Sequence, residues 1–190
     1  MEYDVFISYR RDKGTTRLAR NLKLSLEKFG LQVFFDMEEL TDGKFNEKIY
    51  QAIEASKNVI FLMTEGALDR CVNEGDWVRN ELEHTVDCRV NLIPVTPTGT
   101  RIHFPEGLPE KLAPMRYKVD NLSDLPFAIK AVKTDTYGVT RYKYPRGTTP
   151  DPLDPPRGTQ REYHLKTERG QMKVFVYIQG GKINCWHVEQ

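Results

Sequence analysis

The feature that most constrains the fold of this chain is the alternation of short apolar runs with amphipathic stretches over its first two thirds. Runs that are apolar throughout are typical of strands buried on both faces, with helices between them as covering layers. The predicted strands are 3–8, 31–35, 59–63 and 92–95, with a short strand near 117–119. The pattern therefore predicts an α/β fold with a parallel central sheet.

Amphipathic segments between these runs predict the helices. The first has Leu18, Leu22 and Leu26 on one face, and Gly30 marks its end. A second begins near Lys44, and a closing helix is expected over 122–132. In a parallel sheet ligands lie beyond the carboxyl ends of the strands, so a cleft is expected there.

A third helix is predicted over 77–86. Its core-facing residues are Val78, Leu82, Thr85 and Val86. At 100° per residue, Glu81 lies about 60° and Trp77 about 100° to one side of that stripe. A planar apolar side chain beside a fixed carboxylate suits a flat aromatic cation attached to a sugar. The same spacing is also typical of an amphipathic helix with a half-buried Trp and a solvated Glu.

The C-terminal third has a different pattern. Residues 144–158 are rich in proline, which removes backbone donors and fixes φ, so they are expected to be extended. Three strands follow, at 161–166, 172–178 and 183–188. The sequence thus predicts a first domain over 1–133, a proline-rich linker over 134–160 and a small C-terminal β-meander over 161–190.

Composition excludes several classes of function. A formal net charge of +1 gives no electrostatic case for nucleic acid or an acidic membrane as partner. No apolar run approaches the ~20 residues of a membrane span, and the N-terminus lacks a signal-peptide pattern, so a cytoplasmic location is expected.

No metal site is expected from the sequence either. Three cysteines at wide spacing do not predict a disulfide framework or a zinc knuckle, and the four histidines show no metal-ligand spacing with them. Cys88 could act as a nucleophile only if a histidine approached it in space.

Cofactor motifs are absent as well. No Gly-x-Gly-x-x-Gly follows the first strand, and no P-loop motif occurs, so no bound cofactor is expected. Arg10 and Arg11 follow the first strand and could bind phosphate, or could simply be solvated. The acidic loop over 36–43 could be a solvated hairpin edge or part of a site, and Thr41 or Asp42 could cap the helix behind it.

Five ordered blocks of this sequence resemble the TIR domain family. They read DVFISYRR at 4–11, VFFD at 33–36, LTDGKF at 40–45, GALDRC at 66–71 and DWVRNE at 76–81. The resemblance covers about residues 1–133, and is closest to the NAD-cleaving TIR domain of the animal axon-degeneration NADase and to bacterial TIR NADases. It implies a flavodoxin-like fold.

The resemblance also implies roles for particular residues. Glu81 matches the family's catalytic glutamate. The residues expected to bind substrate are Ser8, Arg10, Arg11, Asp36, Gly43, Phe45 and Trp77. Arg10 is expected to hold the pyrophosphate or to brace Glu81. Two departures are that 71–77 is shorter than in the animal enzyme and that 134–190 falls outside the resemblance.

The function implied by the resemblance is that of an NAD+ glycohydrolase, with NAD+ as substrate rather than cofactor. Its product could be hydrolysed, cyclic or conjugated ADP-ribose. The resemblance further suggests TIR–TIR self-association, and we expect a bacterial anti-phage component with a separately encoded effector. The alternative from another class is a non-enzymatic adaptor that acts through TIR–TIR contacts.

Overall fold

The chain forms two compact units, Met1–Leu122 and Ser123–Gln190. The computed structural model describes residues 2–35, 45–117, 119–122, 125, 141–143, 159–167, 170–179 and 182–189. The predicted boundary at 133 lies outside these ranges, whereas the one at 160 falls within the described range 159–167; the predicted division into domains and linker stays a prediction.

The first unit contains a parallel sheet, as the alternating pattern predicted. Its strands are β1 (Tyr3–Tyr9), β2 (Val33–Phe34), β3 (Ser56–Leu62), β4 (Asn91–Thr96) and β5 (Asp120–Asn121). They are ordered β2-β1-β3-β4-β5, and every neighbouring pair is parallel. This is the flavodoxin-like order, so the predicted fold class is confirmed.

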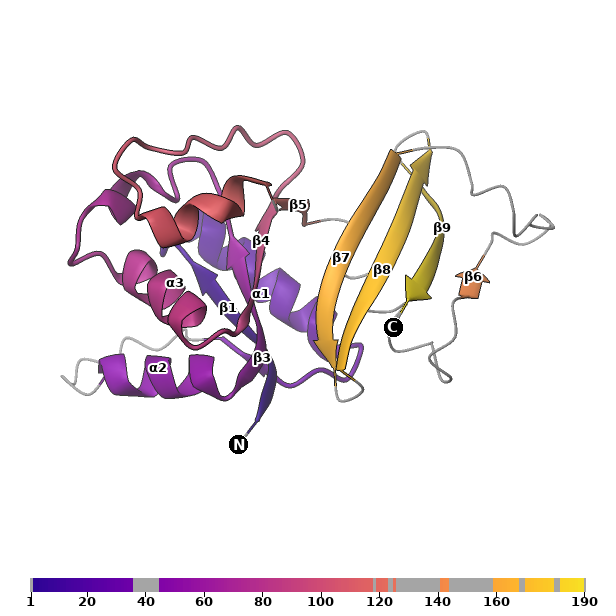
Figure 1. The fold of residues 1–190 in the computed structure, drawn as a ribbon, viewed down its shortest axis with the longest axis horizontal. Coiled ribbons are helices and arrows are strands. Elements are labelled where there is room, and N and C mark those ends of the chain that lie inside the picture. Colours follow the sequence, from indigo (N-terminus) through magenta and orange to yellow (C-terminus); the bar gives the residue numbers. More distant parts are fainter. Residues whose placement is uncertain are drawn as a thin grey trace. The chain divides into compact units, whose positions relative to one another are not determined.

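Helices cover both faces of this sheet. They are α1 (Lys13–Glu27), α2 (Phe45–Glu54) and α3 (Trp77–Asp87), and Figure 1 shows α1 behind the sheet, with α2 and α3 in front of it. Successive side chains of a strand point to opposite faces, so Val59 and Phe61 of β3 pack with α2 and α3, while Ile60 points to the other side. All three are fully buried.

Helix α1 illustrates how local sequence sets the ends of an element. The Asp12 carboxylate caps its first turn by accepting a hydrogen bond from the Thr15 backbone N–H at 2.8 Å. Gly30 follows its end with φ of 73°, a left-handed conformation that glycine adopts without steric cost. The predicted stop at Gly30 is thereby confirmed.

Two short 3-10 helices, η1 (Asp69–Val72) and η2 (Glu110–Tyr117), were not expected from the sequence. In η2 the buried residues Leu112 and Met115 are three apart, the period of a 3-10 helix, so α-helical periodicity could not reveal it. The helix extends to Tyr117, so the strand predicted near 117–119 begins at Asp120 instead. Of the closing helix predicted over 122–132 only Leu122 and Leu125 are described: Leu122 lies in a turn, and Leu125 is helical.

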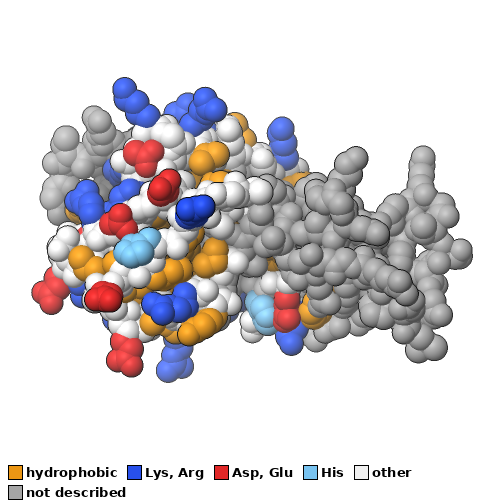
Figure 2. Space-filling model, turned by 90° about the horizontal axis from the view of Figure 1, so that it is seen from above, with side chains coloured by type: hydrophobic (Ala, Val, Ile, Leu, Met, Phe, Trp, Pro, Cys, Tyr) orange, Lys and Arg blue, Asp and Glu red, His pale blue; other side chains and the backbone are white. Residues whose placement is uncertain are grey.

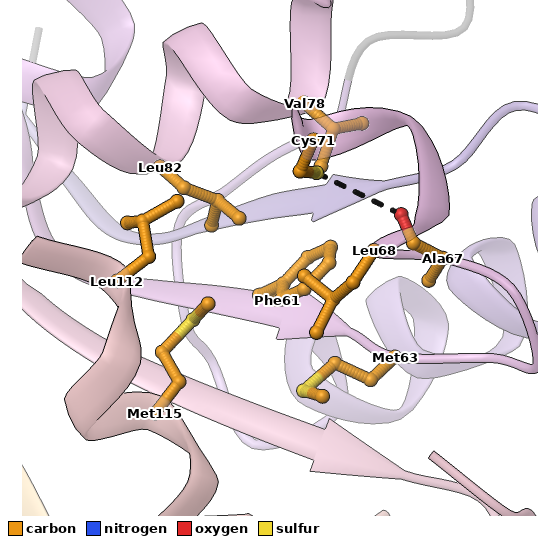
Figure 3. Packing of buried hydrophobic residues seen from close by; sticks show 9 residues of the cluster. All are labelled: Phe61, Met63, Ala67, Leu68, Cys71, Val78, Leu82, Leu112 and Met115. Atoms are coloured by element: carbon orange, nitrogen blue, oxygen red, sulfur yellow. Dashed lines mark hydrogen bonds between the residues drawn. The ribbon is translucent and has the colours of Figure 1, made fainter. Parts of the chain in front are cut away.

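A cluster of buried side chains holds α3, η1 and η2 on the sheet (Figure 3). Val78 and Leu82 of α3 lie in it together with Phe61 of β3 and Met115 of η2. Truncating a buried Leu to Ala typically costs about 2–5 kcal/mol of stability. This packing therefore fixes the position of α3 on the sheet.

The second unit is an antiparallel sheet. Its strands are β6 (Arg141–Lys143), β7 (Thr159–Thr167), β8 (Gly170–Gln179) and β9 (Lys182–Glu189), ordered β6-β9-β8-β7. Strands β7 to β9 correspond to the predicted C-terminal β-meander. β6 was not predicted, and it lies inside the range expected to be linker. The proline-rich stretch 144–158 lies outside the described residues.

The face of the molecule in Figure 2 carries charges of both signs, interspersed over the described residues. None of the described helices combines the length and apolar character needed to cross a membrane.

Candidate functional site

The site is built where β1 ends beside α3. The second half of β1 is buried, including Ser8, which pairs with Phe61 of β3. Its hydroxyl donates a hydrogen bond to Oε2 of Glu81, 73 residues further along the chain, at 2.6 Å. A buried strand end therefore holds the carboxylate of Glu81 at the carboxyl edge of the sheet.

Helix α3 presents the two side chains that the sequence singled out. Val78, Leu82 and Thr85 are buried, which confirms the predicted stripe. Beside them the Trp77 side chain is 44 % exposed, and Glu81 is half-buried. Both residues therefore lie at the border between core and solvent, as the 100° period predicts.

An ion pair fixes the first turn of this helix. Nη1 and Nη2 of Arg10 donate to Oδ2 and Oδ1 of Asp76, at 2.5 and 3.0 Å. Oδ1 of Asp76 also accepts the backbone N–H of Arg79 at 3.1 Å, as an N-cap does. Nη2 and Nε of Arg10 additionally donate to the Ala67 carbonyl at 2.8 and 3.2 Å.

The Arg10 contacts bear on the role expected for that residue. Its side chain is only 17 % exposed, and its described partners are Asp76, Ala67 and Cys71. The guanidinium thus fastens the end of β1 to the cap of α3. We find no direct contact from Arg10 to Glu81 among the described hydrogen bonds.

The electrostatics around Arg10, Asp76 and Cys71 follow from burial and ion pairing. Burial favours the neutral form of Asp76, but the hydrogen bonds from Arg10 and from the Arg79 backbone N–H outweigh it, so the pKa of Asp76 is lowered. Burial raises the pKa of the neighbouring Cys71 thiol to about 12, so this thiol is protonated at neutral pH. Arg10 and Asp76 therefore form a structural ion pair beside an unreactive, protonated thiol.

A pocket with a volume of about 150 Å³ opens at this edge of the sheet. Its lining residues are Tyr9, Arg10, Arg11, Arg70, Asp76, Trp77, Val78 and Glu81. A cavity of about 150 Å³ accommodates benzene, so this one has room for a single six-membered ring. Its wall presents an indole and a carboxylate, groups that suit a flat ring with positive charge.

The other predicted residues are placed as follows. Arg11 is exposed and lines the pocket, and it also borders an open hollow of about 460 Å³ with Lys13, Arg17 and Arg20. Phe45 is the first residue of α2, and its side chain lies outside the described residues. Asp36 and Gly43 lie outside them entirely.

Sequence reasoning assigned no role to Asp76, although one signal was available. An Asp directly before an apolar-periodic stretch is a typical N-cap. Tyr9, Arg70 and Val78 were likewise not assigned to the site, and no local pattern separates them from ordinary core or surface residues. Their place in the pocket depends on how β1, η1 and α3 pack.

Comparison with known proteins supports the family suggested by the sequence blocks. The family model described as "TIR domain" matches residues 5–124. Curated relatives include the NAD(+) hydrolase SARM1 of Danio rerio, 37 % identical over 113 residues, which are 58 % of this chain and 16 % of the relative. The NAD(+) hydrolase sarm1 of Drosophila melanogaster is 38 % identical over 112 residues, covering 57 % of this chain and 8 % of the relative. The chain thus spans less than a fifth of the length of these relatives.

Solved structures were compared as well. A metazoan TIR-STING receptor from C. gigas aligns over 67 % of this chain and 40 % of its own, with 27 % identity and a TM-score of 0.48. The TIR domain of the Toll-related receptor TRR-2 from Hydra magnipapillata aligns over 65 % of this chain and 86 % of its own, with 23 % identity and a TM-score of 0.44.

Proposed function

The chain belongs to the TIR domain family, whose model matches residues 5–124, and from this premise we propose that it cleaves the bond between nicotinamide and ribose in NAD+. The observation that carries the proposal is the Glu81 carboxylate, held by Ser8 on the wall of a ring-sized pocket beside Trp77. Relatives named NAD(+) hydrolases, 37–39 % identical over this region, support the same activity.

The chemistry explains why one carboxylate suffices. Ordinary glycosides need an acid that protonates the leaving oxygen and a second carboxylate. In NAD+ the nicotinamide nitrogen is already positive, so when the C1′–N bond breaks its electron pair neutralises the ring, and no acid is required. Water then attacks C1′ and releases one proton.

Glu81 stabilises the positive charge that develops on the ribose as nicotinamide leaves. At about 4 Å and an effective dielectric constant near 20, this attraction is roughly 4 kcal/mol. Such an energy corresponds to about a thousandfold in rate if it acts mainly in the transition state. Trp77 packs against the nicotinamide or the ribose.

The phosphates of the substrate would lie in the hollow next to this pocket. Arg11 lines both the pocket and the neighbouring hollow, which Lys13, Arg17 and Arg20 also border. Guanidinium groups bind phosphate through paired donors. We assign Arg11 to the pyrophosphate, while Arg10 positions α3 through Asp76. Asp36, Gly43 and Phe45 remain the expected wall on the loop side.

We propose that self-association completes the site. The pocket holds one ring, whereas ligand sites of ordinary size have volumes of about 300–1,000 Å³. A wall from a second copy would supply the difference. Specific activity should then rise with protein concentration, and a constant specific activity would exclude this part of the proposal.

The test of the activity is incubation with NAD+, followed by chromatography for nicotinamide and mass spectrometry of the products. Glu81→Gln should lower nicotinamide release about a thousandfold and leave the unfolding midpoint unchanged. The matched control is Glu83→Gln, two residues along the same helix. If Glu81→Gln kept near-wild-type turnover, Glu81 would have no catalytic role. If the wild type released no nicotinamide in any assembled state, the adaptor function would be favoured.

The same spectra identify the product. Capture of C1′ by water gives ADP-ribose, capture by the substrate's own ribose or base nitrogen gives a cyclic product, and capture by a small nucleophile gives a conjugate. A role in bacterial anti-phage defence with a separately encoded effector is part of this proposal. A product change on adding infected-cell lysate would support it.

A further inference from the structure

A second cluster of reactive side chains lies at the other end of α3. Nε2 of His84 is 3.0 Å from Oε1 of Glu54 and 3.4 Å from Sγ of Cys88. One ligand atom from each residue lies within 4.8 Å of the other two. The cluster is open to solvent, because the Glu54 side chain is 54 % exposed and Cys88 is also exposed.

Regular secondary structure holds this cluster in place. His84 and Cys88 are four residues apart, so they lie on the same face of α3, one turn apart. Glu54 is the last residue of α2, which packs beside α3. The imidazole of His84 is stacked on the Tyr50 ring with centroids 4.3 Å apart, which orients its Nε2 edge.

The geometry argues against a nucleophilic triad at Cys88. In a Cys-His-acid triad the thiol and the carboxylate contact opposite nitrogens of the imidazole, so that one accepts a proton while the other is held. Here both Sγ and the carboxylate oxygen approach the same nitrogen, Nε2. Nδ1 therefore has neither triad partner among these two groups, and the three ligand atoms instead lie together within 4.8 Å of one another.

We propose that Glu54, His84 and Cys88 form a binding site for a zinc-type divalent transition-metal ion. Bonds of about 2.0–2.3 Å at tetrahedral angles place neighbouring ligand atoms roughly 3.3–3.6 Å apart. The separations of 3.0 and 3.4 Å from His84 are close to this, and the Glu54 and Cys88 ligand atoms lie within 4.8 Å of each other, so side-chain shifts on the order of 1 Å would bring all three to an ion. Solvent exposure leaves the fourth position to water.

The donor set selects the class of metal. A thiolate and an imidazole are ligands of Zn²⁺ and Co²⁺, whereas Mg²⁺ and Ca²⁺ prefer oxygen donors. On binding, the Cys88 thiol loses its proton to solvent, and Nε2 donates its lone pair to the ion. The charges of Glu54 and of the thiolate offset those of the ion.

The proposed site differs from one expectation from the sequence. No metal-ligand spacing was expected among the histidines and cysteines, yet His84 and Cys88 are four residues apart, a separation that places two ligands on one helix face. The third ligand comes from α2, 30 residues earlier than His84. A bound ion would crosslink α2 to α3, the helix that carries Glu81.

The proposal is tested by titrating the purified full chain with Co²⁺ and with Zn²⁺, and it does not rest on the proposed activity. Co²⁺ should bind with 1:1 stoichiometry and produce thiolate-to-metal charge-transfer absorption in the near ultraviolet. Zn²⁺ should abolish that absorption by competition and raise the unfolding midpoint. Mg²⁺ should do neither.

Variants assign the ligands. Cys88→Ser should remove the charge-transfer band, and His84→Phe, which keeps a ring against Tyr50, should weaken binding at least about tenfold, as should Glu54→Gln. Matched controls are Cys185→Ser, a thiol in the other unit, and His103→Ala, an exposed histidine paired only with Asp69 among its described contacts. Absence of 1:1 binding, or a band that persists in Cys88→Ser but disappears in Cys185→Ser, would overturn the assignment.

Discussion

The two ends of helix α3 use polar side chains in opposite ways. At the N-terminal end Asp76 is buried, and it is paired with Arg10 in a fixed bidentate geometry. At the C-terminal end His84, Cys88 and Glu54 converge while open to water. Buried charges are costly unless every partner is in place, so the first arrangement creates a rigid frame. Solvent-exposed polar side chains are hydrated and cost little without a bound ion, so the second arrangement suits the reversible binding of the proposed metal ion.

The largest expected effect on stability comes from removing the buried pair. Asp76→Ala should lower the free energy of unfolding by about 3 kcal/mol, of which about 1 is the lost N-cap and about 2 the uncompensated charge of Arg10. We take a value below the roughly 3–5 kcal/mol typical of a fully buried pair, because Arg10 keeps 17 % of its side chain exposed. Denaturant unfolding of wild type and Asp76→Ala measures the total loss.

Asp76→Asn separates these two contributions, because an Asn side chain can still cap the helix. It should cost about 2 kcal/mol. The matched control is Asp69→Asn, an exposed carboxylate near His103, which should change stability by less than about 0.5 kcal/mol. Equal effects of Asp69→Asn and Asp76→Asn would show that the buried pair is not a frame.

The same pair predicts a pH dependence. The pKa of Asp76 in the folded protein lies below its ordinary value of 3.8, so its contribution to stability is fully present above pH 3.8 and is lost as the pH falls through the lowered pKa. The stability difference between wild type and Asp76→Asn should therefore narrow under acid. Unfolding midpoints of both proteins between neutral pH and pH 2 measure it. A gap that stays constant to pH 2 would contradict the pairing.

Prediction from the sequence worked where one element contains the whole signal. The edge shared by Trp77 and Glu81 follows from 100° per residue alone, and so does the buried stripe beside it. The parallel sheet follows from uniformly apolar runs separated by helices. The four-residue spacing of His84 and Cys88 is a signal of the same kind, and no metal site was expected from it.

Contacts between distant elements could not be predicted in this way. The hydrogen bond between Ser8 and Glu81 joins residues 73 apart and depends on where α3 docks on β1. Whether Arg10 pairs with Asp76 or with Glu81 likewise depends on distances of a few ångströms, which no sequence period specifies. Helix η2 was not predicted because its buried residues, Leu112 and Met115, are three positions apart rather than at α-helical spacing.

A smaller effect is expected at Ser8, which links the rigid frame to the proposed chemistry. Ser8→Ala removes a hydrogen bond to Glu81, worth about 1.5 kcal/mol or more for a charged acceptor, so turnover should fall at least about tenfold. The matched control is Ser25→Ala, whose hydroxyl bonds a carbonyl within α1 at an exposed position and should leave turnover unchanged. Steady-state nicotinamide release measures the effect. An unaltered rate in Ser8→Ala would mean that the hydrogen bond from Ser8 is not what orients Glu81.

The smallest expected effect is at Trp77, which belongs to the rigid end of α3 but has a side chain 44 % exposed. If the indole serves as a surface for the substrate, Trp77→Ala should raise KM about fivefold, the equivalent of roughly 1 kcal/mol of stacking, while Trp77→Phe should retain most of the binding. Because only part of the indole is buried, the unfolding free energy should change by less than about 1 kcal/mol in either variant. A large loss of stability with unchanged KM would instead make Trp77 part of the rigid frame. Glu81 would then be the first residue of α3 with a role in catalysis rather than in stability.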